Sequence, residues 1–214
     1  ETNYGSVEAP LTVAQAIALG AEQCAENDQV SKQEIYVKGI ITSSVSVNGN
    51  YGWKDFNIKD AAADENSLYI YQVNKTEGVA APAENDTVVI KGYLKNYSGK
   101  LQIANKSSSY PAMVSNVRGT SSITVTENEH VTVTVKAGDN EVTSATNGTS
   151  ITVTAVAASG YNLDAVKING VPAEANNGVV TFELAGNVVI STVASDASVV
   201  VETKTDSPVS KNFK

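Results

Sequence analysis

The 214-residue chain nearly lacks the side chains on which many catalytic and metal sites depend. It holds one cysteine (Cys24), one histidine (His130) and one tryptophan (Trp53). A single cysteine excludes an internal disulfide and a thiolate cluster, and a zinc site would need several histidines or cysteines. A Ser-His-Asp triad would depend on His130, at the start of an alternating strand pattern. We therefore expect a non-catalytic protein without a cofactor or a metal.

Long apolar runs and excess positive charge are also missing. No stretch approaches the roughly 20 apolar residues of a membrane-spanning helix, so we expect no membrane span. The net charge is −8, and it divides evenly between two parts of the chain. Residues 1–115 contain nine lysines and thirteen acids, which leaves −4. Residues 116–214 contain six basic and ten acidic residues, which also leaves −4. Because an acidic chain is repelled by phosphate backbones, general nucleic-acid binding is disfavoured.

The residue types that are abundant are Thr, Ser, Val, Asn and Gly, which are typical of strands and turns. One stretch differs. The segment PLTVAQAIALGAEQC (10–24) has apolar residues at helical spacing after Thr12, which suits an N-cap. We predict a helix over about 12–25, with Cys24 as a small buried residue.

Five strand-like runs follow this helix, each with apolar residues on one face. The turn VNGNYG separates the first two, and SGK separates the last two. The runs YVKGII (36–41) and VIKGYL (89–94) each carry a glycine on the predicted inward face. A glycine there lets a strand bend or admits a close neighbour, as a small closed barrel requires. The runs are EIYVKGIITSSVSV, WKDFNIKD, SLYIYQV, DTVVIKGYLKNY and LQIAN.

This order resembles the OB-fold domains of secreted bacterial proteins, over roughly residues 10–115. In those domains a helix like TVAQAI precedes the first strand, and a hairpin like ENDTVVIKGYLKNYSGKLQI closes the barrel. The resemblance implies a five-stranded OB-like barrel with an N-terminal helix. An unrelated β-meander is the alternative.

The second half alternates almost without interruption, as in SITVTAVA (150–157). The segment GYNLDAVKINGVPAE and the closing run GVVTFELAGNVVISTVA resemble a repeat module of bacterial surface proteins, over roughly residues 121–195. The Asn-Gly step within it suits a type I′ turn. The resemblance implies a small Ig-like β-sandwich that acts as a spacer or interaction module. We predict an OB-like domain over 1–116, an all-β domain over 117–204 with a last strand at 198–204, and a polar tail at 205–214.

The loop KDAAADEN (59–66) gathers Asp60, Asp64 and Glu65. Carboxylate oxygens bind Ca²⁺, so this loop is a candidate metal site, although it lacks the EF-hand spacing. A plain polar loop is the favoured interpretation, and we expect no metal.

The predicted outward face of the first domain is rich in aromatic rings with lysines among them. In OB-folds this face and its flanking loops hold oligonucleotides or oligosaccharides, and rings stack on bases and sugars alike. The alternative is that tyrosine simply suits strand surfaces. The candidate ligand-binding residues are Tyr51, Trp53, Tyr69, Tyr71, Tyr93, Lys95, Tyr97 and Lys100.

Two functions of different class remain open. The first is a secreted or cell-surface binding or adhesion module, with a polysaccharide or surface protein as partner. The second is a purely structural spacer; single-stranded nucleic-acid binding is weaker because of the charge. Both resemblances imply an exported bacterial protein at the outer cell surface, with a lipid anchor upstream of residue 1, and we expect a monomer.

Overall fold

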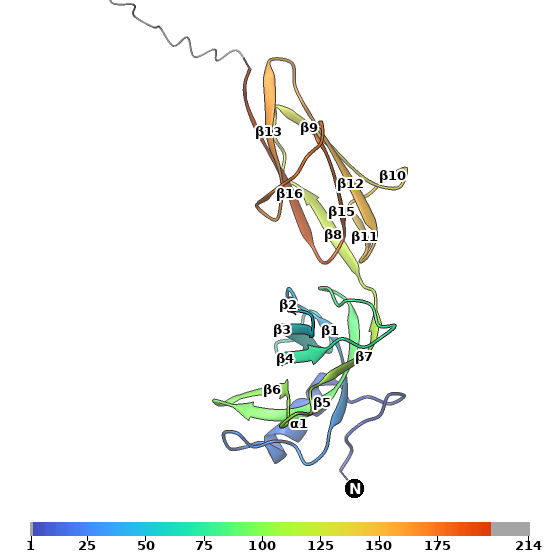
Figure 1. Ribbon diagram of the computed structural model, residues 1–214, viewed down its shortest axis with the longest axis vertical. Coiled ribbons are helices and arrows are strands. Elements are labelled where there is room, and N and C mark those ends of the chain that lie inside the picture. The colour runs from blue at the N-terminus through green and yellow to red at the C-terminus, as the bar shows by residue number, and fades with distance from the viewer. Residues whose placement is uncertain (1, 198–214) are drawn as a thin grey trace, which may run out of the picture.

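The computed structural model describes residues 2–197. These residues form one helix and sixteen strands, which confirms the prediction of a mainly β protein. Two parts follow one another along the long axis of the molecule (Figure 1). The strand predicted at 198–204 and the tail predicted at 205–214 lie outside the described residues. Between residues 2 and 197, no helix is both long and apolar enough to cross a membrane.

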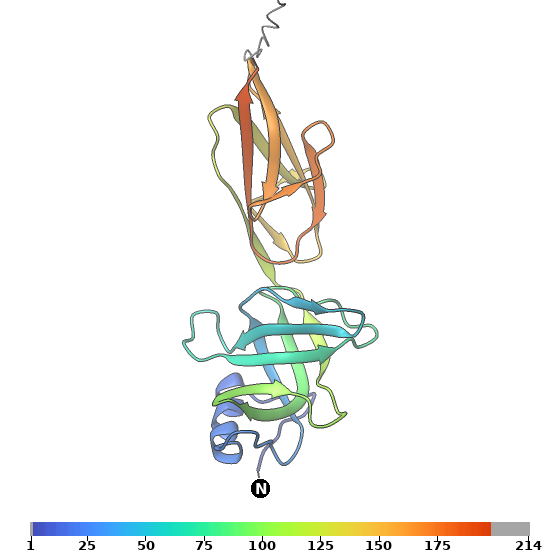
Figure 2. The ribbon, with the colours of Figure 1, turned by 60° about the vertical axis from the view of Figure 1, so that its left-hand side comes forward.

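The first part contains one strongly curled sheet of seven strands (Figure 2). Five of them, β1, β3, β4, β6 and β5, pair in that order and close a ring, because β5 pairs again with β1. Only the β4–β6 pair within this ring is parallel. The sequence predicted five strands. The first predicted run is divided into β1 and β2 in the structure, and β7 is additional. The bounds are β1 (Ile35–Ile41), β2 (Ser46–Asn48), β3 (Gly52–Lys59), β4 (Leu68–Asn74), β5 (Thr87–Tyr97), β6 (Lys100–Ala104) and β7 (Ala112–Val117).

The two repeated glycines of β1 and β5 face the interior of this ring. Both are buried, and a Cβ at Gly39 would lie 2.9 Å from the Cβ of Ile58. A Cβ at Gly92 would lie 2.8 Å from Cγ2 of Ile103. Glycine is therefore present in these strands because neighbouring side chains occupy the space of a Cβ.

Helix α1 (Val13–Gln23) begins where the sequence predicts it. Thr12 is the N-cap and forms a reciprocal capping box with Gln15. The carboxylate of Asp60 satisfies two further N–H groups: its oxygens accept from Val13 N at 2.6 Å and from Ala14 N at 2.9 Å. This acidic loop residue thus holds the helix against the end of β3.

The helix covers one end of the first hydrophobic core. Its buried residues Val13, Ala16 and Leu19 join a cluster with the inward side chains of the ring. Cys24 belongs to the same cluster, and burial raises the pKa of its thiol. A protonated, buried thiol of this kind is a packing residue, as predicted.

The second part is a sandwich of two sheets around a second core. One sheet has the order β10-β9-β12-β15 and the other β11-β8-β16-β13-β14. Asn169 and Gly170 both have positive φ and connect β13 to β14, as the Asn-Gly step predicts. The bounds are β8 (Thr120–Val125), β9 (Val131–Ala137), β10 (Asn140–Glu141), β11 (Ser144–Thr146), β12 (Ser150–Ala157), β13 (Tyr161–Ile168), β14 (Val171–Ala173), β15 (Val179–Glu183) and β16 (Val188–Asp196).

The two parts meet at a buried polar joint centred on Asp86, which has no exposed surface. Only Arg118 and Gly119 separate β7 from β8, so the chain has little slack here. The Asp86 carboxylate accepts four hydrogen bonds and lies 3.5 Å from the Arg118 guanidinium. The four donors are Ala83 N, Asn116 Nδ2, Gly119 N and Asn147 Nδ2.

Asn147 completes the joint from the second part. Its Nδ2 donates to Glu84 O and to Asp86 Oδ1, both at 2.7 Å. Its Oδ1 accepts from Ser121 Oγ at 2.7 Å and from Gly186 N at 3.0 Å. Every hydrogen-bonding position of this buried amide is therefore used, and residues 84–86 are clamped against the second part.

Candidate functional site

A groove of about 440 Å³ lies on the outer face of β4, β6 and β5. Its lining contains aromatic, basic and amide side chains but no carboxylate. The lining residues are Tyr69, Tyr71, Lys95, Tyr97, Lys100, Gln102, Ala104 and Asn105. Five of the eight residues predicted from the sequence are among them.

Strand register explains why these side chains converge. Tyr69 of β4 lies beside Gln102 of β6, which in turn lies beside Lys95 of β5. Lys100 pairs with Tyr97 in the next row toward the β5–β6 turn. In each row β6 contributes the middle residue, so it forms the floor and the flanking strands form the walls. Because neighbouring strands are about 4.8 Å apart, the two walls are about 10 Å apart at the backbone.

Ala104 contributes the smallest side chain to the floor of the groove. It pairs with Tyr93 of β5, and continuation of the parallel β4–β6 register places Tyr71 on its other side. Ala104 is itself only 2% exposed, so the side chains around it cover most of its surface. The groove follows β6 from Lys100 to Asn105.

Gln102 is the most informative residue of this floor. Its side chain is only 6% exposed, and its amide makes no hydrogen bond to any residue in the described range 2–197. Neither of its polar atoms is sealed from solvent, since neither is among the fully buried unpartnered atoms. Buried amides nearly always have partners, so an amide that opens into a groove without one is available to a ligand.

Tyr69 is held in place by a second network. Its hydroxyl donates to Asp55 Oδ1 at 2.5 Å, and Lys54 Nζ lies 3.6 Å from the other oxygen of that carboxylate. The hydrogen bond to Asp55, together with desolvation and the nearby negative charge, raises the pKa of Tyr69 to about 12. The ring is therefore neutral at any physiological pH and fixed at its hydroxyl end.

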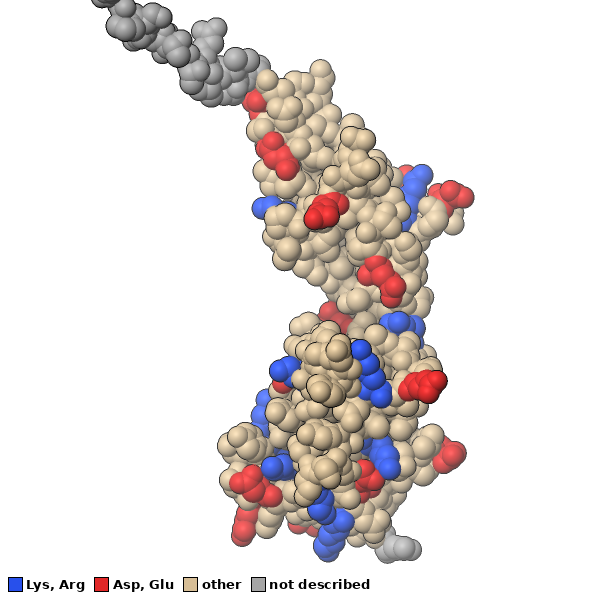
Figure 3. Space-filling view, in the orientation of Figure 1, with Lys and Arg blue, Asp and Glu red and all other residues tan. Residues whose placement is uncertain are grey.

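Lysine ammonium groups lie over the rings of this face. Lys100 Nζ is 4.2 Å from the centroid of the Tyr69 ring, and Lys95 Nζ is 5.5 Å from that of Tyr97. Just beyond the groove, Lys106 Nζ is 4.6 Å from the centroid of Tyr93. All three distances are within the range of a cation–π contact. On the face shown in Figure 3, basic side chains gather on the first part, and the second part shows few.

Three predicted site residues lie outside the groove lining. Tyr93 borders it, beside Ala104. Tyr51 is 75% exposed on the β2–β3 turn and lines no part of it.

The prediction that Trp53 belongs to the ligand-binding face is wrong. Trp53 lies within β3 and is 8% exposed, as part of the first core. The physical reason is local: Asp55 has a φ of 59°, and the alternation of buried positions in β3 breaks between Trp53 and Phe56. A left-handed residue within a strand shifts its pleat by one position, so Trp53 turns inward.

Sequence reasoning missed the floor residues Gln102, Ala104 and Asn105. The signal was present, because the alternation of LQIAN places Leu101 and Ile103 on one face and therefore Gln102 and Ala104 on the other. The cue was weak because the strand is only five residues long.

The other sequence candidates have structural partners. Asp60 caps α1, and Asp64 Oδ2 accepts from Ala61 N at 2.7 Å. The His130 ring stacks on Tyr161 with centroids 3.8 Å apart. Among the described residues, no group of three or more His, Cys, Asp or Glu could hold a metal ion.

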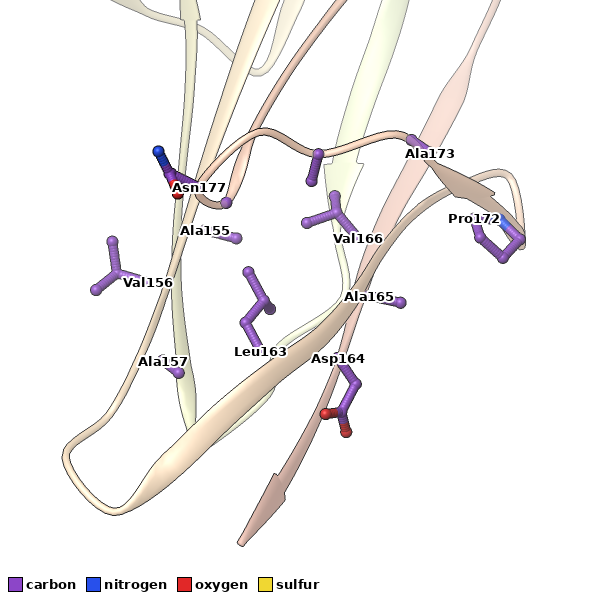
Figure 4. Close-up of a pocket in the computed structure, with 12 residues that line it drawn as sticks. Ala155, Val156, Ala157, Leu163, Asp164, Ala165, Val166, Pro172, Ala173 and Asn177 are labelled. Carbon is purple, nitrogen blue, oxygen red and sulfur yellow. The ribbon is translucent and has the colours of Figure 1, made fainter. Parts of the chain in front are cut away.

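A second groove, of about 600 Å³, opens between the two sheets of the second part (Figure 4). Leu163 and Val166 point into it, while Asp164 points away. Most of its lining is small and apolar, so it offers a ligand few polar contacts to fix its orientation.

Searches with this chain against protein-family models, curated proteins and solved structures find no match.

Proposed function

We propose that this protein is a non-catalytic extracellular binding module that holds a polysaccharide chain in the groove of β4, β6 and β5. The observation that carries the proposal is the unpartnered Gln102 amide at the floor, between walls of tyrosine. Ligand sites combine apolar or aromatic walls with a few convergent polar groups, and this groove has that composition. A channel along one strand suits a linear polymer.

The chemistry of a sugar matches both kinds of surface. The faces of sugar rings are apolar and stack on aromatic rings, and Tyr71 and Tyr97 are 44% and 56% exposed. Sugar hydroxyls donate and accept, as does the amide of Gln102. Lys95 and Lys100 add donors at the end near the β5–β6 turn.

We further propose that the ring of β1, β3, β4, β6 and β5 is an OB-type barrel. Five strands that close a ring, with the predicted helix before the first of them, support this assignment. The strands β2 and β7 would then be extensions of that barrel. The second part would serve as an Ig-like spacer in an exported, monomeric surface protein with a lipid anchor.

The test is affinity electrophoresis of the purified chain through gels that contain different polysaccharides. We expect at least one polysaccharide to retard the protein, and Tyr71→Ala to weaken that binding roughly fivefold, because a ring contact contributes about 1 kcal/mol. Tyr110→Ala is the matched control: Tyr110 is also 44% exposed, but it does not line the groove.

The outcomes separate the candidate functions. Equal losses with both variants would show that the groove is not the site. Retardation by no polysaccharide would overturn the proposal and favour the spacer function, in which both parts only connect other elements.

A further inference from the structure

The groove is a basic surface on an acidic protein. Its lining has two lysines and no Asp or Glu, whereas the whole chain carries a net charge of −8. The sign of the groove is thus opposite to that of residues 1–115, where acids outnumber basic residues thirteen to nine. The arrangement therefore concentrates positive potential in one channel.

Both groove lysines can accept an anionic partner. Lys100 makes no ion pair with a described residue, and its ammonium lies over the Tyr69 ring. Lys95 lies 3.6 Å from Asp28, but that carboxylate side chain is 62% exposed at the rim. An exposed pair of this kind is weak, so a ligand anion can replace it.

The aromatic rings position these charges. A cation–π contact orients an ammonium while leaving N–H donors for other partners. Tyr69 is itself fixed by its hydrogen bond to Asp55, so the ring that the Lys100 ammonium contacts is held in place before a ligand binds. Lys106 over Tyr93 continues the line of charges beyond Ala104.

We infer that the ligand is an acidic polysaccharide, whose carboxylate or sulfate groups bind Lys95 and Lys100 while a sugar ring stacks on Tyr71. The inference rests on the proposed function and narrows it to one class of glycan. Gln102 would then form hydrogen bonds with sugar hydroxyls between the two lysines and the ring of Tyr71.

Single-stranded nucleic acid fits this surface less well. It binds by stacking several successive bases on aromatic rings. Here Tyr69, Tyr93 and Tyr97 each have a lysine over one ring face. Among the described groove residues this leaves Tyr71 as the ring without one, which suffices for a single sugar but not for a run of bases. The nucleic-acid backbone also carries a charge at every nucleotide, which the net negative charge of the first part opposes along any longer path. A glycan with more widely spaced anions needs only the few lysines of the groove.

The experiment compares hyaluronate, which carries one carboxylate on every second sugar, with its carboxyl-reduced derivative, which keeps the backbone and lacks the charge. Binding is measured by titration calorimetry at several salt concentrations. A neutral mannan and single-stranded DNA complete the set. We expect hyaluronate to bind at least tenfold more tightly than the reduced polymer, with an affinity that falls linearly on a log–log plot against salt.

Variants locate the charge effect. Lys100→Met should weaken hyaluronate binding about tenfold and lower the salt slope by about one, as loss of one charged contact does. Lys75→Met is the matched control, since Lys75 is also exposed and lies 5.9 Å over the Trp53 ring, outside the groove lining. Binding of the neutral polymers should not change in either variant.

Each outcome of these binding measurements supports or overturns a different statement. Equal binding of both forms of the polymer, or of mannan alone, would overturn the acidic class while leaving a polysaccharide site intact. Tighter binding of DNA at the same salt concentration would overturn the inference in favour of nucleic acid. Binding of no polymer at all would remove the proposed function together with the inference.

Discussion

Replacing Gln102 by leucine should make the protein more stable and a poorer binder. Gln102 is 6% exposed and its amide has no partner within residues 2–197, so in the free protein the amide loses most of its contact with water without gaining a hydrogen bond from the protein. An unpartnered buried polar group costs about 1 to 3 kcal/mol, and we take about 1 kcal/mol because both polar atoms retain some contact with solvent. Leucine has a similar volume and removes this cost.

A change of 1 kcal/mol shifts the melting temperature of a domain of this size by about 4 °C. Calorimetry should therefore show an upward shift of about 4 °C in the transition of the first part. Binding of the retarding polysaccharide should weaken at least fivefold, because the sugar hydroxyl loses its partner in the groove. Opposite signs for stability and binding are typical of a residue kept for its ligand.

Gln72→Leu is the control, because Gln72 lies on the neighbouring strand β4 but does not line the groove. It is half-buried, and we expect a change in stability below about 0.5 kcal/mol with no effect on binding. A fall in the melting temperature of Gln102→Leu would refute the reasoning, since it would mean that the amide stabilises the free protein.

Three further changes test other parts of the structure. Asn147→Ala should destabilise the protein by about 3 kcal/mol, since it leaves the joint without its central amide, and it should broaden the distribution of interdomain angles seen by small-angle X-ray scattering; unchanged scattering would contradict this. Gly92→Ala should cost about 1 to 3 kcal/mol in thermal unfolding, because its Cβ would lie 2.8 Å from Ile103; a neutral result would mean that β5 and β6 separate easily. Asp55→Asn should lower the pKa of Tyr69 from about 12, so tyrosinate absorbance should appear at lower pH. Because the folded pKa lies above the ordinary value of 10.0, the stability from this pair is complete below that pH and is lost as the pH rises toward 12. Asp55→Asn should reduce this loss, since the hydrogen bond to Asp55 is its largest cause.

Period-two alternation explains how much of the groove could be predicted. It places Tyr69 and Tyr71 on one face of β4, and it places Lys95 and Tyr97 on one face of β5. The SGK turn joins β5 to β6 as a hairpin and so brings Lys100 beside Tyr97. These are local rules, and they apply without knowledge of the rest of the fold.

Features that depend on distant residues could not be predicted. The burial of Trp53 follows from the left-handed Asp55, a conformation that aspartate adopts only in particular surroundings. The joint depends on Asp86 and Asn147, which are 61 residues apart in the chain. Residues 114–122, which contain the predicted boundary between the two domains, lie mostly in the strands β7 and β8, because partners elsewhere pair with them.

The parallel pairing of β8 with β16 determines how the second part would respond to a pulling force. β8 enters this part at the joint, and β16 runs beside it to the far end (Figure 1). Tension between the two ends would therefore pull these strands past one another along their length. The backbone hydrogen bonds between residues 188–190 and 123–125 would then be strained simultaneously, rather than breaking one after another from one end. Such an arrangement resists stretching between the joint and the far end of the second part.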